Sequence, residues 1–194
     1  MSEFNDETNN NTVLNTVLDW IETIVMYIFV VILIFSFVLR VVVVEGKSMM
    51  VTLYDKDLLL VTNILYTPEN NDIIVLNSDV LDKTVVKRVI AVEGQTVEID
   101  YNNNYVAVDG EKLTENYIKE SVMYDDKLEF DQKYFDVNSQ KYIYKVPENC
   151  VFVLGDNRNH SSDSRYFGCV YVDDILGKVI LRIMSSYGDL GFVK

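Results

Sequence analysis

Histidine and cysteine are scarce in this chain of 194 residues, which has one histidine, His160, and two cysteines, Cys150 and Cys169. The cysteines form no C-x-x-C motif, and zinc prefers cysteine and histidine ligands. We therefore expect no metal site and no cofactor. The two cysteines are expected to be half-buried free thiols; a disulfide between them is the alternative if the domain lies in an oxidising compartment.

Basic residues are also few, since 17 Lys and Arg stand against 30 Asp and Glu, which gives a formal net charge of −13. They form no basic stripe and no arginine-rich segment. Affinity for a phosphate backbone comes from clustered Lys and Arg. The composition therefore argues against nucleic acid as a partner.

Charged side chains are absent from residues 23–39, TIVMYIFVVILIFSFVL. A spanning helix needs roughly 17–25 mostly apolar residues, so residues 23–40 are predicted to form a transmembrane anchor, preceded by a mobile acidic tail over residues 1–22. A cleavable signal peptide would have a basic start and a small-residue cleavage site, and this segment has neither. The remaining alternative is a buried core helix, which would be unusually apolar on every face.

The charges that flank this anchor bear on its orientation. Lys and Arg are enriched on the cytoplasmic side of a span. Residues 1–22 contain neither, whereas Arg40 and Lys47 follow the apolar segment. Taken alone, these two charges favour a cytoplasmic location for the C-terminal part of the chain.

After residue 40 the sequence is mainly β in character. Short runs rich in β-branched residues alternate with Asn, Asp and Pro, which is typical of strands separated by turns. The expected strands cover residues 41–44, 57–63, 72–76, 84–92, 96–100, 105–108, 150–154 and 178–183. Such strands indicate a sandwich or a coiled barrel of sheets. We therefore predict a mainly β fold: an N-terminal transmembrane helix, then a coiled-sheet β domain over residues 41–194 with a small cap or insertion at about 101–145.

A first polar constellation, EGKSMMVTL over residues 45–53, follows the first of these β runs. Gly46 stands two residues before Ser48. A nucleophilic serine is often held on a tight turn, where its Oγ projects and neighbouring N–H groups can stabilise an oxyanion. Ser48 is therefore a candidate nucleophile, and the alternative is a serine in an ordinary surface turn.

A nucleophilic serine needs a base, which here is either His160 in a Ser-His-Asp triad or a neutral lysine. Lys87 lies in the apolar strand VVKRVI, residues 85–90. Because side chains alternate along a strand, Lys87 and Arg88 point to opposite faces, and one of them must share a face with apolar residues. Burial there would lower the pKa of a lysine and favour its neutral form. The alternative is an edge-strand lysine that blocks aggregation.

A second polar constellation, GDNRNHSSDSR over residues 155–165, follows the apolar strand at 150–154. Nearly all of its residues are polar, and Asp163 and Arg165 are spaced so that they can form an ion pair. Such a segment is either a solvated loop or a loop held by its own hydrogen bonds and ion pairs. In the second case the Ser161 hydroxyl could lie near a buried amine.

Three segments together resemble the motifs of type I signal peptidases: SMMVTL at 48–53, VVKRVIAVEG at 85–94 and the more specific GDNRNHSSDSR at 155–165. The resemblance extends from the anchor to about Lys178. The small size and single anchor are similar to the Gram-positive bacterial form. The chain departs from the family pattern at Val51, where relatives have proline, and at Gly46, where some have a serine that binds the oxyanion. Oxyanion binding is therefore expected from backbone N–H groups, chiefly that of Ser48.

The resemblance implies roles for individual residues. Ser48 is the expected nucleophile, Lys87 the general base, and Ser161 the hydroxyl that orients the lysine amine, whereas His160 matches a variable position and receives no role. The other expected site residues are the neighbour of the base, Arg88; a buried pair, Asp163 and Arg165; a supporting turn, Gly155, Asp156, Asn157 and Arg158; and a substrate pocket, Gly46, Met49, Leu53, Val85 and Val86.

The resemblance also implies a function and a location. The chain is expected to be a membrane-bound serine endopeptidase that removes signal peptides from exported preproteins, without metal or cofactor. Its catalytic domain would lie on the extracytoplasmic side of the cell membrane behind a single span, in contact with the lipid bilayer and near the secretion translocon, and the acidic tail of residues 1–22 would lie in the cytoplasm. This placement conflicts with the orientation that Arg40 and Lys47 favour. The alternatives are a self-cleaving Ser-Lys protease, and a catalytically inactive membrane-anchored β domain that binds exported proteins.

Overall fold

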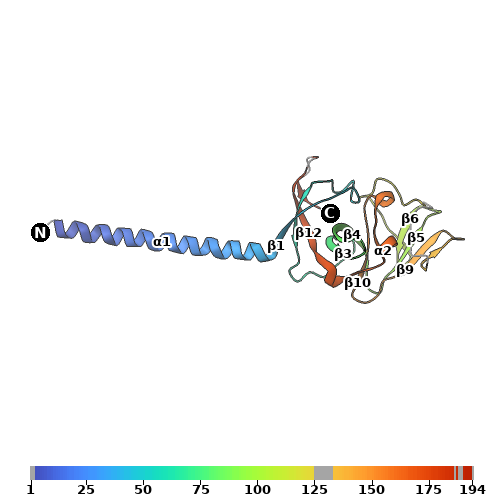
Figure 1. Ribbon diagram of the computed structural model, residues 1–194, viewed down its shortest axis with the longest axis horizontal. Coiled ribbons are helices and arrows are strands. Elements are labelled where there is room, and N and C mark those ends of the chain that lie inside the picture. Colours follow the sequence, from blue (N-terminus) through green and yellow to red (C-terminus); the bar gives the residue numbers. More distant parts are fainter. Residues whose placement is uncertain (1–2, 125–132, 186, 188–189, 194) are drawn as a thin grey trace. The chain divides into compact units, whose positions relative to one another are not determined.

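A computed structural model describes residues 3–124, 133–185, 187 and 190–193, and divides the chain into two units at Leu39. The first unit contains the helix α1 (Glu3–Val38), and the second is the β-rich part of the chain (Figure 1). The predicted fold class, mainly β after one apolar N-terminal helix, is confirmed.

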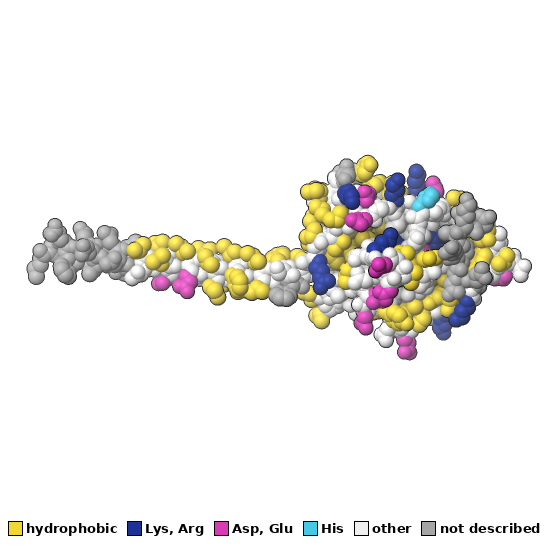
Figure 2. Space-filling model, in the orientation of Figure 1, with side chains coloured by type: hydrophobic (Ala, Val, Ile, Leu, Met, Phe, Trp, Pro, Cys, Tyr) yellow, Lys and Arg dark blue, Asp and Glu magenta, His cyan; other side chains and the backbone are white. Residues whose placement is uncertain are grey.

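Within α1, the segment Leu14–Leu33 is long and apolar enough to cross a membrane, and none of it is buried by protein. Large side chains such as Trp20, Tyr27 and Phe29 are more than half exposed, and hydrophobic atoms line this helix in Figure 2. In water such a surface would be costly, whereas in a bilayer it faces hydrocarbon. The helix is therefore consistent with membrane anchoring.

The helix boundaries differ from those predicted. Residues 3–22 were expected in a mobile tail, but α1 begins at Glu3, and it ends at Val38, so that Arg40 belongs to the following strand. No proline or glycine interrupts residues 3–38, and a helix nucleated in the apolar part can propagate toward the N-terminus at little cost per residue. The first two residues of the predicted tail lie outside the described residues.

The larger sheet has eight strands, in the order β1-β2-β12-β3-β4-β10-β11, with β13 also paired to β12. Pairings of β4 with β3 and β10, and of β12 with β2, β3 and β13, are antiparallel. The strands are β1 (Leu39–Val43), β2 (Leu58–Thr62), β3 (Ile73–Ser78), β4 (Lys83–Val92), β10 (Cys150–Leu154), β11 (Val170–Tyr171), β12 (Ile175–Met184) and β13 (Gly191–Phe192). Short helices η1 (Arg158–His160), α2 (Ser164–Phe167) and η2 (Val172–Asp174) join its later strands.

A second sheet of five strands has the order β7-β6-β5-β9-β8. Figure 1 shows β5, β6 and β9 on the opposite side of the β domain from β12. The strands are β5 (Thr96–Asp100), β6 (Tyr105–Val108), β7 (Glu111–Lys112), β8 (Phe135–Asp136) and β9 (Lys141–Lys145). The predicted ranges of β5, β6 and β10 coincide with the observed strands.

The segment predicted as a cap or insertion, about 101–145, does not stand apart from the β domain. Its last strand, β9, pairs with β5 along its whole length, from Thr96 opposite Lys145 to Asp100 opposite Lys141. Tyr142 and Tyr144 alternate with more exposed residues and enter the core, a period-2 pattern that the sequence interpretation missed. Residues 125–132 of this segment lie outside the described residues.

β4 runs through the centre of the β domain. Its side chains Val86, Val89 and Ile90 belong to three different hydrophobic clusters, so this strand is buried on both faces rather than on one. The two cations between them, Lys87 and Arg88, are 2% and 1% exposed. Their burial requires compensation, because an isolated charge loses its hydration inside a protein.

Candidate active site

Ser48 lies in the turn that follows β1. At one end of the turn, Gly46 has a φ of +89°, a left-handed conformation that glycine adopts without strain, and its N–H donates to Asp55 Oδ1 at 2.8 Å. At the other end, the Leu53 N–H donates to the Met49 carbonyl at 2.9 Å, and both of these side chains are buried in the core. The turn is therefore fixed at both ends, with Ser48 half-buried between them.

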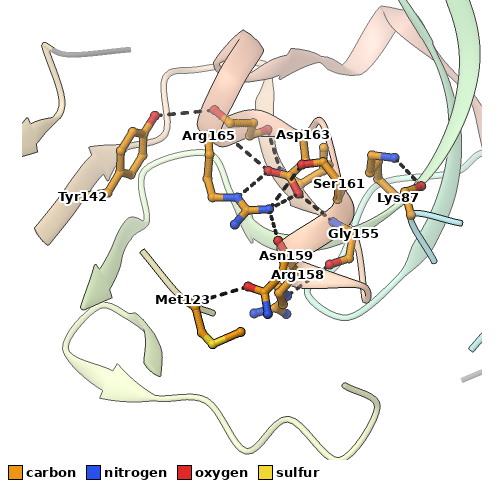
Figure 3. A network of polar contacts seen from close by, with 12 residues as sticks. Lys87, Met123, Tyr142, Gly155, Arg158, Asn159, Ser161, Asp163 and Arg165 are labelled. Atoms are coloured by element: carbon orange, nitrogen blue, oxygen red, sulfur yellow. Dashed lines mark hydrogen bonds and ion pairs between the residues drawn. The ribbon is translucent and has the colours of Figure 1, made fainter. Parts of the chain in front are cut away.

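Lys87 reaches this turn from β4. Its Nζ lies 2.8 Å from Ser48 Oγ and 3.1 Å from the carbonyl oxygen of Val86, to which it donates. Figure 3 shows the Lys87 amine with a dashed line that marks one of its hydrogen bonds. The two residues that the sequence singled out, 39 positions apart, are therefore in hydrogen-bonding contact.

Burial lowers the pKa of Lys87 from 10.5 to about 8, because the ammonium form loses its hydration. The negative charge of Asp163 opposes this shift, while the positive charges of Lys83 and Arg165 add to it. At pH 8 about half of the molecules thus carry a neutral amine at this position. A neutral amine 2.8 Å from a serine hydroxyl can accept its proton.

Gly155 follows β10 and begins the polar loop, residues 155–165, next to the Ser48 turn. A Cβ at this position would lie 2.5 Å from the carbonyl oxygen of Ser48 and would overlap the side chain of Ser161. The Gly155 N–H donates to Asp163 Oδ2 at 3.1 Å. Glycine is therefore required here by space, which the sequence did not indicate.

Asn157 ties the same loop to the turn by two hydrogen bonds. Its backbone N–H donates to the carbonyl oxygen of Ser48 at 2.9 Å, and its Nδ2 donates to that of Lys47 at 3.0 Å. Both bonds hold the backbone next to the hydroxyl while leaving the hydroxyl to Lys87. Asn157, which was expected to help hold the Asp163–Arg165 pair, thus also contacts the Ser48 turn.

The predicted pair Asp163 and Arg165 forms a buried bidentate ion pair, with Nε–Oδ1 2.7 Å and Nη2–Oδ2 2.8 Å. Arg165 also donates to the carbonyl oxygen of Arg158 at 2.7 Å (Figure 3). Burial alone would raise the pKa of Asp163, but the charge and hydrogen bonds of Arg165 outweigh it and hold that pKa below its ordinary value. The carboxylate thus stays ionised and braces the loop, since its side chain also accepts a bond from Gly155.

Arg88, the neighbour of Lys87, has a different partner. Its Nε and Nη2 donate to the two carboxylate oxygens of Asp156 at 2.9 and 2.7 Å, and its Nη1 donates to the Asn71 carbonyl oxygen at 3.0 Å. Thr52, in the Ser48 turn, donates to the same carboxylate at 2.5 Å. Asp156 therefore links β4, the polar loop and the nucleophile turn in one buried network.

Ser161 departs from the role that the resemblance implies for it. The Ser161 hydroxyl is buried, but among the described residues it makes no hydrogen bond, so the expected bond to the Lys87 amine is not formed in this structure. The His160 side chain is exposed, and it is Lys87 that contacts Ser48. The geometry thus favours the lysine over the histidine as the base.

A cavity of about 320 Å³ opens beside Ser48 and Lys87. Four of the five residues expected in a substrate pocket line it: Gly46, Met49, Val85 and Val86. The fifth, Leu53, does not, because it is fully buried in the core behind the turn. Its role is to anchor the turn, since the apolar residues at 49 and 53 both point inward.

Two residues of this site escaped the sequence interpretation. The ring of Tyr117 lies 3.9 Å from the Arg88 guanidinium, and Glu115 Oε1 lies 2.5 Å from Arg158 Nη2. Both come from the segment read as an insertion, where no motif or periodicity marks them. In the part of the chain that the structure describes, no cluster of three His, Cys, Asp or Glu side chains could hold a metal ion.

Comparisons with known proteins show which family this chain resembles. The family model described as "Signal peptidase, peptidase S26" matches residues 17–184. A signal peptidase I from Bacillus caldolyticus is 40% identical over 145 residues, which cover 72% of this chain and 76% of that protein. Signal peptidase I S from Bacillus subtilis (strain 168) is 36% identical over 77% of this chain and 79% of its own. The crystal structure of a signal peptidase I from Enterococcus faecalis V583 is 32% identical, with a TM-score of 0.43, and covers 58% of this chain and 97% of that one.

Proposed function

This chain belongs to the signal peptidase family, peptidase S26, and on that premise we propose that it is a membrane-bound serine endopeptidase that removes N-terminal signal peptides from exported preproteins. Ser48 is the nucleophile and Lys87 the general base. The observation that carries the proposal is the 2.8 Å contact between Ser48 Oγ and the buried Nζ of Lys87. A serine and a lysine in this relation can carry out acyl transfer without a histidine.

In the first half of the reaction, neutral Lys87 accepts the proton of Ser48 as Oγ attacks the carbonyl carbon before the cut. The oxyanion that forms is held by backbone donors, chiefly the N–H of Ser48. Lys87 then gives its proton to the departing amine, and an acyl-enzyme on Ser48 remains. In the second half, Lys87 accepts a proton from water, the hydroxide adds to the acyl carbon, and Ser48 recovers its proton as the signal peptide leaves.

Substrate choice follows from the cavity beside the dyad. Met49, Val85 and Val86 line part of this cavity of about 320 Å³ with apolar surface. We expect small side chains at the −1 and −3 positions of the precursor, because larger ones would meet these residues. Binding does not require a deep pocket, because enzyme and precursor share one membrane surface, which raises their local concentration.

The apolar part of α1, which includes Leu14–Leu33 and the charge-free residues 34–38, is proposed to be a single transmembrane span that retains the enzyme in the cell membrane, with the β domain outside the cytoplasm near the translocon. Exported precursors expose their cleavage sites there. The two positive charges after the span, Arg40 and Lys47, favour the opposite orientation. Protease treatment of intact cells tests the sidedness: the β domain is expected to be degraded, and protection of it would contradict this placement.

The proposed activity is tested with the full chain in membranes and a precursor that carries a signal peptide. Ser48→Ala and Lys87→Met are each expected to abolish cleavage, whereas Lys145→Met, a change at an exposed lysine of β9, leaves it intact. If His160→Ala removed cleavage while Lys87→Met retained it, the lysine mechanism would be wrong. If the wild-type chain bound precursor without cutting it, a catalytically inactive binding domain would be the better description. If the chain cleaved itself but not the precursor, it would be a self-cleaving protease.

A further inference from the structure

The two cysteines stand at the base of the polar loop that supports the Ser48 turn. Cys150 is the first residue of β10, and Cys169 directly precedes β11. These two strands are antiparallel neighbours, with Cys150 opposite Tyr171 and Val151 opposite Val170. The chain between the cysteines leaves the sheet at the end of β10, carries the supporting residues 155–165, and returns at β11. We refer to residues 151–168 as the active-site loop.

The thiols themselves are in contact. Cys169 Sγ lies 3.1 Å from Cys150 Sγ, although neither cysteine is part of a disulfide in this structure. The register explains why they meet, because residue 169 is two positions from the partner of Cys150 and diagonal neighbours in an antiparallel pair share one face of the sheet. They are also the only two cysteines of the chain. An intramolecular bridge therefore has a single possible pairing.

We propose that Cys150 and Cys169 form a reversible disulfide that closes the active-site loop at its base. The pairing rests on the register and contact of the two thiols, independently of the catalytic assignment. Formation of this disulfide in the cell also rests on the proposed extracytoplasmic location, because disulfides persist in oxidising compartments.

The oxidation proceeds by thiol–disulfide exchange. Cys169, which is partly exposed, attacks a disulfide of a small thiol or of an oxidoreductase and releases one thiol. The buried Cys150 then attacks the sulfur of Cys169 and releases the second thiol. Two protein thiols and one external disulfide thus become one protein disulfide and two thiols. Burial, followed by the hydrogen bond with Cys169, raises the pKa of Cys150 to about 12, so its thiolate is scarce at neutral pH and the second step accelerates with rising pH.

The bridge would act on the part of the fold that holds the catalytic turn. The cysteines are 19 positions apart, and closing a loop of this size removes conformational freedom from the unfolded chain. For a domain of this size the expected rise in the midpoint of thermal unfolding is roughly 5–10 °C. Local opening of the loop, which would separate Asn157 from the Ser48 carbonyl, is suppressed in the same way.

The test uses the full chain in detergent, reduced first and then incubated with excess oxidised glutathione. Remaining thiols are alkylated with a maleimide, and the protein is analysed by intact mass, by peptide mapping and by thermal unfolding. We expect a loss of two hydrogens, no maleimide adduct, a peptide linking Cys150 to Cys169, and the higher unfolding midpoint. Cys169→Ser serves as the control, and oxidation should leave its unfolding midpoint unchanged.

Three results would overturn the proposal: two thiols still open to alkylation, a glutathione adduct that persists at Cys169, or a bridge between two molecules. A bridge that forms without any rise in the unfolding midpoint would refute the stabilising role. The bridge should form equally in Ser48→Ala, because it does not depend on catalysis. A wild-type chain that forms the bridge but cleaves no precursor would contradict only the proposed function. A chain that cleaves precursor but forms no bridge would contradict only this inference.

Discussion

Lys87→Met should make the β domain more stable while it removes catalysis. The substitution keeps the apolar stem of the side chain and deletes an amine that is 2% exposed. The pKa of this amine falls from 10.5 to about 8 on folding. The difference, 10.5 − 8, is about 2.5 pKa units, which corresponds to about 3 kcal/mol at 1.36 kcal/mol per unit.

The pH dependence gives this prediction its signature. Between pH 8 and 10.5 the unfolded chain still binds the Lys87 proton and the folded chain has lost it, so the free energy of unfolding of the wild type rises with pH through this window. The cost of burying the charged Lys87 amine is fully present below pH 8 and absent above pH 10.5. Losing the hydrogen bonds of the amine costs about 1 kcal/mol. The variant should therefore be more stable by about 2 kcal/mol at pH 7, and this advantage should vanish by pH 10.5.

The measurement is urea unfolding of the full chain in detergent at several pH values. Near-ultraviolet circular dichroism of the tyrosines is the suitable signal, because the single tryptophan, Trp20, lies in α1 rather than in the β domain. Lys145→Met, at an exposed lysine, is the matched control and should show little change in stability. If Lys87→Met were less stable than the wild type at pH 7, or if its advantage did not shrink with pH, the amine would not be buried in the way described.

Three further predictions concern the same site. Because Lys87 must be neutral to act as base, kcat/KM for precursor cleavage should rise with pH to a plateau with a midpoint near 8; a rate that is flat from pH 6 to 9 would contradict this. Gly155→Ala should lower kcat by at least about 10²-fold, because the added Cβ would displace the Ser48 turn. Gly94→Ala is the control, since its Cβ would meet no atom within 4 Å. It should cost about 1–2 kcal/mol of stability because of its left-handed backbone, but it should retain activity. Arg88→Met should destabilise the domain by about 3–5 kcal/mol in urea unfolding, because it leaves Asp156 charged and buried. The additional change Asp156→Leu should restore part of the lost stability. A double variant less stable than Arg88→Met alone would refute the pairing.

Strand positions were largely predictable because they depend on local pattern. β5, β6 and β10 coincide with runs of β-branched and apolar residues that have turn-forming residues on both sides. β9 was missed because Tyr142 and Tyr144 are embedded among charged residues, and only pairing with β5 explains why that alternation forms a strand. The start of α1 was misplaced for a related reason: composition indicates where a helix is apolar, not how far it propagates.

The candidate site shows the same division. Motifs and alternation brought out Ser48 and Lys87 in advance, whereas the burial of Leu53, the unbonded hydroxyl of Ser161 and the cover provided by Tyr117 come from packing between distant segments. None of these depends on neighbours in the sequence.

Residues 85–90 by themselves determined that a lysine and an arginine would stand side by side in an apolar strand and face opposite ways. They did not determine the partner of either side chain, nor the charge of Lys87. The tertiary structure gives Arg88 the carboxylate of Asp156, 68 positions away, and gives Lys87 a neutral hydroxyl and a carbonyl oxygen instead. Both side chains lose hydration on burial, but only Arg88 gains an ionised partner, and the pKa of Lys87 therefore falls.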